Sequence, residues 1–143
     1  MKNQFESAQN IIEIYKKHAR AWTELRGNFL YEKAWLDHFL ALIPQHSKIL
    51  DLGCGSGKPI ADYLIRHDHK ITGVDSSDVM IEMARQNFPE QHWLQADMRT
   101  VEFDQKFNAI LAWDSFFHLT PNDQRQMFRQ FARLAQQGTV LMF

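Results

Sequence analysis

The sequence KILDLGCGSGKP occupies residues 48–59 of a 143-residue chain. It opens with a short apolar run, which is typical of a buried strand, and continues through Asp51 into three glycines at alternate positions. Pro59 then marks the start of a helix, because its missing N–H is not needed there. Since glycine tolerates positive φ and lets a ligand approach the backbone, this order of elements predicts a nucleotide-binding corner.

Helical periodicity precedes this corner, and strands alternate with helices after it. Apolar residues at three- and four-residue spacing predict helices at 7–25, 29–42, 59–66, 77–88 and 120–137, the last opened by a capping box at 120–123 and ended by Gly138. Short apolar runs predict strands within the quoted stretch and at 70–75, 92–96, 107–113 and 139–143. This alternation predicts an α/β fold, a doubly wound, Rossmann-like parallel sheet of order 3-2-1-4-5 with an N-terminal helical cap.

The chain has the length of a single domain, divided into a helical cap at 1–46 and an α/β core at 47–143. The strand at 139–143 has no following element to cover it, and an uncovered apolar edge invites pairing with another chain. The sequence therefore predicts either a natural protein that continues past Phe143 or a homodimer formed through this edge.

Composition excludes several classes of partner. The net charge is −1, whereas a general nucleic-acid binder carries a marked basic excess. Cys54 is the single cysteine, so no internal disulfide can form and a reducing compartment is expected. The N-terminus lacks an apolar signal core, and no apolar run approaches the ~20 residues that span a bilayer. We therefore expect a cytoplasmic protein that binds neither nucleic acid nor membrane.

The glycine spacing bears on the choice between a structural turn, a dinucleotide site and a different nucleotide site. Three spaced glycines after a strand, with an acid at the end of the next strand, disfavour a purely structural turn. A pyrophosphate cradle has the spacing G-x-G-x-x-G, but here the third glycine is Gly57 and the expected glycine position is Lys58. The spacing is thus a poor match to a nicotinamide or flavin enzyme.

Four motifs in order resemble those of the class I S-adenosylmethionine-dependent methyltransferases, over nearly the whole chain. They are Asp51–Gly57, Gly73–Ser77 with Met80 and Ala84-Arg85, Ala96–Met98, and Leu111–Leu119. The stretch Arg26–Leu36 is similar to the glycine N-methyltransferase-like members. The resemblance implies a methyltransferase that converts S-adenosylmethionine to S-adenosylhomocysteine while methylating a small molecule. Family members continue with a sixth and a seventh strand, so a form truncated after strand five, which binds the cofactor without turnover, is the alternative.

Candidate cofactor-binding residues follow from strand ends and from the resemblance. Asp75, at the end of its strand, can accept both ribose hydroxyls through its two carboxylate oxygens. The resemblance places Asp97 at the adenine amino group and Met98 beside the ring, with Met80 and Trp113 packed near the adenosine or the methionine part. It also places Asp51 near the cofactor ammonium and Arg26 at its carboxylate. The full predicted set is Arg26, Asp51, Gly53, Cys54, Gly55, Gly57, Asp75, Ser76, Met80, Asp97, Met98 and Trp113.

The methyl acceptor would lie beyond the strand at 107–113. Methyl transfer is an in-line displacement that depends mainly on positioning, but a hydroxyl or a protonated amine needs a base. Asp114 and His118, four residues apart, are the candidate catalytic bases. Tyr15, Trp22, Phe116 and Phe117 are candidates for an aromatic lid on the acceptor, although each also fits helix packing. No histidine spacing suits a metal, so no metal site is expected.

Overall fold

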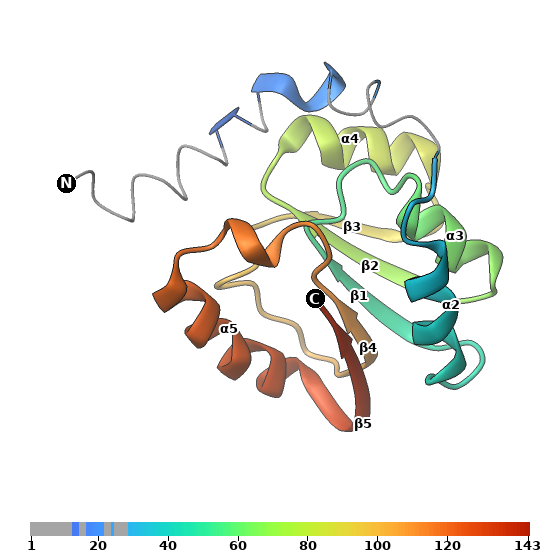
Figure 1. Cartoon of the computed structure of the whole chain (residues 1–143). Helices are drawn as coiled ribbons and strands as arrows, with labels where there is room; N and C mark the ends of the chain where they lie inside the picture. The colour runs from blue at the N-terminus through green and yellow to red at the C-terminus, as the bar shows by residue number, and fades with distance from the viewer. Residues whose placement is uncertain (1–12, 15–16, 22–23, 25–28) are drawn as a thin grey trace.

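The computed structural model describes residues 13–14, 17–21, 24 and 29–143, and it confirms the predicted sheet (Figure 1). Five strands are arranged in the order β3-β2-β1-β4-β5, and every pairing between them is parallel. The strands are β1 (Lys48–Leu52), β2 (Lys70–Asp75), β3 (His92–Gln95), β4 (Phe107–Leu111) and β5 (Ala135–Met142). The helices are α2 (Lys33–Ala41), α3 (Ile60–Arg66), α4 (Asp78–Asn87), the 3₁₀ helix η1 (Phe116–His118) and α5 (Pro121–Leu134).

The N-terminal cap is described only in part. The described residues at 13–14, 17–21 and 24 are helical, in agreement with the helix predicted over 7–25. Three predicted site residues, Tyr15, Trp22 and Arg26, lie outside the described residues. Among the residues that are described, no helix combines the length and the apolar character that crossing a bilayer requires.

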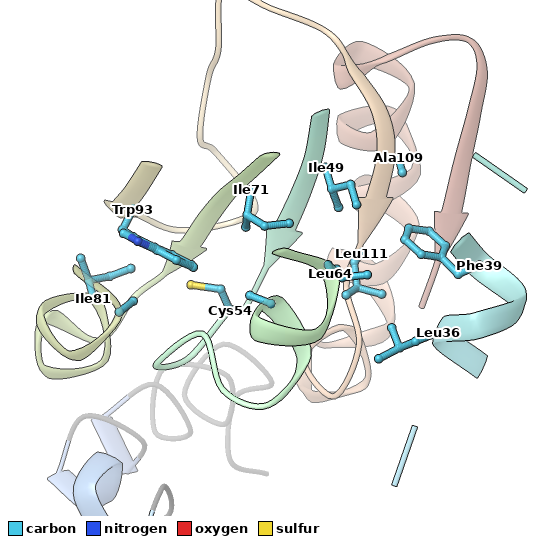
Figure 2. Packing of buried hydrophobic residues seen from close by; sticks show 12 residues of the cluster. Leu36, Phe39, Ile49, Cys54, Leu64, Ile71, Ile81, Trp93, Ala109 and Leu111 are labelled. Carbon is cyan, nitrogen blue, oxygen red and sulfur yellow. The ribbon is translucent and has the colours of Figure 1, made fainter. Parts of the chain in front are cut away.

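Two apolar layers sandwich the sheet, because successive strand side chains point to opposite faces. In β1, Ile49 belongs to one layer while Leu50 and Leu52 belong to the other. The first layer also contains residues of α2, α3 and α4, with Trp93 of β3 among them (Figure 2). The second is covered by α5, through Met127, Phe131 and Leu134, and by the segment that precedes β4. The sheet is therefore covered on both faces. Because every pairing is parallel, the carboxyl ends of all five strands lie at one edge.

The end of α5 differs from the prediction. Gly138 was expected to terminate a helix at 120–137, but α5 ends at Leu134 and β5 begins at Ala135. Ala135 pairs with Phe107 and Val140 with Ala109, so the residues between them form an irregular bulge in which Gly138 has φ +86°. The Thr139 hydroxyl closes this bulge by donating to the Phe107 carbonyl (2.6 Å). Pairing with β4 therefore outweighs the local helix-ending signal of the glycine.

The start of α5 is capped by half of the predicted capping box. The Thr120 side chain accepts a hydrogen bond from the Asp123 N–H at 3.1 Å, as predicted. The Asp123 carboxylate, however, contacts Arg99 rather than the backbone N–H of Thr120. At the start of α3, Pro59 occupies the N-cap rather than the first helical turn, and the helix begins at Ile60.

Gly73, in the middle of β2, allows the ring of Trp93 to pack directly against the strand. A Cβ added at Gly73 would lie 2.3 Å from Trp93 Cε3 and 2.9 Å from Cys54 Sγ. We expect Gly73→Ala to lower the free energy of unfolding by about 1–3 kcal/mol, since the indole must shift within a packed layer. Urea unfolding of the two proteins measures this difference.

A double-mutant cycle isolates the cause. Trp93→Leu removes the opposing ring, so the Gly73→Ala penalty should shrink in that background, and the two changes should show a favourable coupling. Gly138→Ala is the matched control, because a Cβ there meets nothing within 4 Å and its cost comes from positive φ alone. Additive effects at Gly73 and Trp93 would contradict the proposed contact.

Candidate functional site

The glycine turn after β1 is fastened to β2 and α4. The N–H groups of Gly53 and Cys54 both donate to the Val74 carbonyl, at 2.7 and 3.0 Å. On the other side, the Asn87 side chain of α4 donates to the Ser56 carbonyl at 3.1 Å. The motif glycines at 53, 55 and 57 all have positive φ, which explains their alternate spacing. These hydrogen bonds anchor the turn, which lies where β1 meets β4 at the switch point of the sheet.

Asp75, at the end of β2, is held against this turn by two backbone hydrogen bonds. Its Oδ2 accepts from the Gly55 N–H and its Oδ1 accepts from the Ser77 N–H, both at 2.9 Å. Burial raises the pKa of the Asp75 carboxyl, although these two bonds oppose the shift. Each carboxylate oxygen has a further lone pair, so Asp75 can still accept from a ligand that carries two hydroxyls.

Asp51 is a buried carboxylate beside the same turn. It lies in β1 opposite Gly73, and only 4% of its surface is exposed. Burial, together with the charge of Asp75, raises the pKa of Asp51 to about 7. Within the described part of the chain, neither an ion pair nor a side-chain hydrogen bond is found at Asp51. A buried acid in this condition favours a cationic ligand, which would stabilise its ionised form.

Three further side chains surround the turn. Met80 Sδ lies 3.9 Å from the point where a Cβ would stand on Gly55, and Met98 Cε lies 3.5 Å from the same point on Gly53. Ser115, from the segment after β4, lies closer to Gly53, with its Cβ only 2.4 Å from that point. Its hydroxyl donates to the Leu52 carbonyl at 2.8 Å. Gly53 thus permits the segments after β3 and β4 to meet at the turn.

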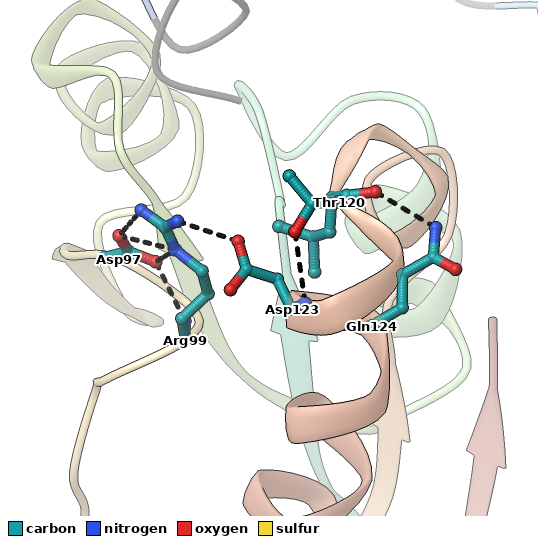
Figure 3. A network of polar contacts seen from close by, with 6 residues as sticks. Asp97, Arg99, Thr120, Asp123 and Gln124 are labelled. Atoms are coloured by element: carbon teal, nitrogen blue, oxygen red, sulfur yellow. Dashed lines mark hydrogen bonds and ion pairs between the residues drawn. The ribbon is translucent and has the colours of Figure 1, made fainter. Parts of the chain in front are cut away.

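Asp97, the residue expected at the adenine amino group, is bound by Arg99 (Figure 3). Arg99 Nη2 lies 2.6 Å from Asp97 Oδ2, and Arg99 Nη1 lies 3.1 Å from Asp123 Oδ2 of α5. Burial alone would raise the pKa of Asp97, but the hydrogen bonds and charge of Arg99 outweigh it and hold that pKa below its usual value. Asp97 is therefore ionised at neutral pH.

The two candidate bases lie in the segment after β4. Asp114 is exposed and has φ +55°, which turns the chain sharply into η1. His118 ends η1 and is half-buried, with its ring 4.2 Å from the exposed ring of Phe117. Burial lowers the pKa of His118, and the nearby charge of Asp114 only partly offsets this shift. His118 is therefore a neutral imidazole at pH 7 and can accept a proton.

The remaining predicted residues are Cys54 in the turn, Trp113 after β4 and Ser76 after β2. Cys54 is buried and packs in the layer that contains Trp93, and burial raises the pKa of its thiol well above the usual value. Trp113, expected near the adenosine or the methionine part, is partly buried against the same layer. Ser76 is half-buried, and its carbonyl accepts from Gln95 at 3.4 Å. Among the described side chains, no group of three or more metal-ligating residues could hold a metal ion.

Sequence reasoning missed Arg99, Ser115 and the pair formed by Gly73 and Trp93. An isolated glycine inside a strand is a recognised sign of close approach, so Gly73 could have been found. Nothing in the local sequence indicates that Arg99 joins two carboxylates, because Asp123 is distant in the chain and was assigned to the helix cap.

Comparison with known proteins shows which family the chain belongs to. A sequence profile described as a methyltransferase domain matches residues 49–138, which is more than half of the chain. The chain belongs to this methyltransferase family. The match covers the glycine turn, both acids that flank it and the segment carrying His118, so the predicted class I methyltransferase fold is confirmed.

Individual methyltransferases agree with this assignment. YqeM of Bacillus subtilis strain 168, which is named as a methyltransferase, is 32% identical over 91% of the chain, and O-methyltransferase cnsE of Penicillium expansum is 26% identical over 93%. The crystal structure of a TehB-like SAM-dependent methyltransferase from Corynebacterium glutamicum is 28% identical, with a TM-score of 0.67 over 94% of the chain and 73% of that structure. The chain spans 54% of YqeM and 56% of cnsE, about half the length of these relatives.

Proposed function

We propose that this methyltransferase domain binds S-adenosylmethionine at the glycine turn and methylates a small-molecule acceptor. The observation that carries the proposal is Asp51, a buried carboxylate that favours a cation, at the switch point of a methyltransferase fold. S-adenosylmethionine carries an ammonium group and a sulfonium group, so it offers such a charge. The SAM dependence of the TehB-like structure supports the same ligand.

Different residues of the chain would bind different parts of the ligand. Asp75, fixed by the Gly55 and Ser77 amides, would accept from the ribose hydroxyls. Asp51 would face the ammonium end, and Asp97 with Met98 would hold the adenine. Met80, beside Gly55, would pack against the adenosine. Because hydrogen bonds already hold the turn to β2 and α4, we expect binding to require little further ordering.

The reaction that this arrangement supports is an in-line methyl transfer. S-adenosylmethionine, when bound, supplies a methyl group on a positively charged sulfur. As the acceptor atom bonds to the methyl carbon, the sulfur keeps the electron pair of the broken carbon–sulfur bond, which leaves S-adenosylhomocysteine. His118, a neutral imidazole in the segment after β4, would remove the proton of an acceptor hydroxyl. Phe117, 61% exposed beside it, would contact the acceptor. The cnsE name supports an oxygen acceptor, which agrees with a role for this base.

We expect Asp75→Asn to weaken S-adenosylhomocysteine binding by about 1–3 kcal/mol, since a charged acceptor of two hydroxyls becomes a neutral amide. The same change also affects the bonds to Gly55 and Ser77, so circular dichroism must show that the variant folds. Calorimetric titration of both proteins measures the difference. Asp104→Asn, at an exposed loop position, is the matched control and should leave the affinity unchanged.

Two results would contradict the proposal at different levels. A wild-type protein that binds neither S-adenosylmethionine nor S-adenosylhomocysteine would refute the cofactor assignment. Binding without methylation of any acceptor in a screen of small hydroxyl compounds, carboxylates and amines would instead favour a cofactor-binding module without turnover.

A further inference from the structure

Arg99 lies between two carboxylates that belong to different parts of the fold. Asp97 follows β3, whereas Asp123 lies in the first turn of α5, and the guanidinium bridges them (Figure 3). All three side chains are largely shielded, with exposed fractions of 33% for Asp97, 23% for Arg99 and 9% for Asp123. Such shielding makes charge-assisted hydrogen bonds stronger than they are at an open surface.

The contacts of Arg99 nearly fill the acceptor capacity of Asp97. Asp97 Oδ1 accepts from the Arg99 backbone N–H at 2.9 Å and from Nε at 3.0 Å. Oδ2 accepts from Nη2 at 2.6 Å, and the same Nε–H is shared with it at 3.0 Å. Because Nε divides one proton between two oxygens, a ligand donor can replace its bond to Oδ1 while Oδ2 keeps both of its partners.

Asp123 prevents Arg99 from following a ligand or leaving Asp97. Its carboxylate takes Nη1, the one guanidinium nitrogen that does not face Asp97. The loop itself is fixed to α5, since the Gln130 side chain donates to the carbonyls of Met98 (3.2 Å) and Val101 (2.7 Å). The guanidinium therefore has a fixed orientation on both sides.

We infer that Arg99 is a positioning residue that aims Asp97 as an obligate hydrogen-bond acceptor and so makes the site select a 6-amino purine over a 6-oxo purine. This inference rests on the proposed function. The adenine ring presents an N–H donor at its amino group, whereas hypoxanthine presents a carbonyl oxygen at the same position. A carboxylate that is locked in the ionised state binds the donor and repels the carbonyl, while a carboxylate free to rotate or to take up a proton tolerates both.

The test compares two ligands rather than one affinity. S-adenosylhomocysteine and its deaminated counterpart, S-inosylhomocysteine, differ at the 6-position of the purine and its ring tautomer. The quantity compared is the dissociation constant of S-inosylhomocysteine divided by that of S-adenosylhomocysteine. We expect this ratio to fall roughly tenfold or more in Arg99→Met, because the charged contact that discriminates the two ligands loses its alignment. Arg99→Lys keeps the charge without the planar fork and should restore only part of the ratio. Calorimetric titration at pH 7.5 and 5.5 supplies the values.

Comparing the ratio at pH 7.5 and at pH 5.5 distinguishes a positioning role of Arg99 from general damage to the fold. Without Arg99, the pKa of Asp97 should rise because burial is no longer opposed, so the ratio should decrease further at pH 5.5. Asp123→Asn weakens only the far side of the guanidinium, so it should lower the ratio less, and it provides the same test if Arg99→Met does not fold. Arg129→Met, at an exposed position of α5, is the matched control and should leave the ratio unchanged.

The outcomes distinguish this inference from the function on which it rests. If the wild-type protein binds S-adenosylhomocysteine but the folded Arg99 and Asp123 variants retain its ligand ratio, the inference is overturned and the proposed function survives. An equal loss of affinity for both ligands overturns it as well, since that result indicates a purely structural ion pair. If the wild-type protein binds neither ligand, both proposals fail together.

Discussion

Asp51→Asn is expected to stabilise the free protein above pH 7 and, at the same pH, to weaken its binding of S-adenosylhomocysteine. The two effects have one cause. Burial raises the pKa of Asp51 to about 7, so ionisation of this side chain opposes folding unless a cation is present. Asparagine keeps the size of the side chain but removes its charge. The variant should therefore lose both the cost of burying that charge and the attraction for a cationic ligand.

The direction with pH follows from the two protonation states. The folded protein binds the Asp51 proton up to about pH 7, whereas the unfolded chain releases it near the ordinary pKa of an aspartate, 3.8. Stability therefore falls as pH rises between these values and levels off above pH 7. Since one pKa unit corresponds to about 1.4 kcal/mol, the wild-type penalty at pH 8 is at most about 4 kcal/mol. Asp51→Asn should remove it, with a larger gain at pH 8 than at pH 5.5.

The affinity for the ligand should rise with pH, whereas the stability of the free protein falls. A cationic group beside Asp51 lowers its pKa, so the wild-type protein should release a proton when it binds S-adenosylhomocysteine below pH 7. Titrations in two buffers of different ionisation enthalpy measure that proton directly. The affinity of the wild-type protein should rise with pH towards 7, and the affinity of Asp51→Asn should be lower and should lack this rise.

Asp104→Asn removes an acid of the same type from an exposed loop and controls for the change in net charge. It should alter neither the stability nor the proton release. An Asp51→Asn variant that is destabilised at pH 8, or that binds the ligand as well as the wild type, would remove Asp51 from the site.

Much of the fold and the turn could be predicted because they depend on short-range patterns. Alternating strands and helices, with right-handed crossovers, leave few arrangements, and the observed order is the predicted one. In a parallel sheet, residues near the carboxyl ends of strands meet at one edge. Asp51 and Asp75 were therefore predictable as neighbours of the glycine turn from their positions alone.

The features that could not be predicted depend on contacts between distant segments. Gly138 carries a strong helix-ending signal, yet the pairing of Ala135 with Phe107 decides where β5 begins. Asp123 fits a capping box by its spacing, yet the guanidinium of Arg99 offers a charged partner that a backbone N–H cannot match. In both cases a local preference of modest energy yields to a tertiary contact. Dimer formation through β5, which lies at the sheet edge, stays a prediction.

His118→Asn should reduce turnover of hydroxyl acceptors by about 10²–10⁴-fold, the usual contribution of a positioned general base. A hydroxyl must lose its proton as the methyl group is transferred, and the amide of asparagine cannot accept one. A carboxylate acceptor is already ionised at pH 7, so the same variant should methylate it at close to the wild-type rate. The comparison of kcat between the two acceptor classes is therefore the measurement that reports a base.

The pH profile provides an independent check on His118. Because burial lowers its pKa below the usual 6.5, the imidazole is neutral at pH 7, and the rate with hydroxyl acceptors should decline only in more acidic solution. Binding of S-adenosylhomocysteine should not change in the variant, since the imidazole is proposed to act on the acceptor. Equal losses of kcat for hydroxyl and carboxylate acceptors would show instead that His118 supports the structure of η1. In that case Asp114, four residues earlier and exposed, would be the remaining candidate for the base.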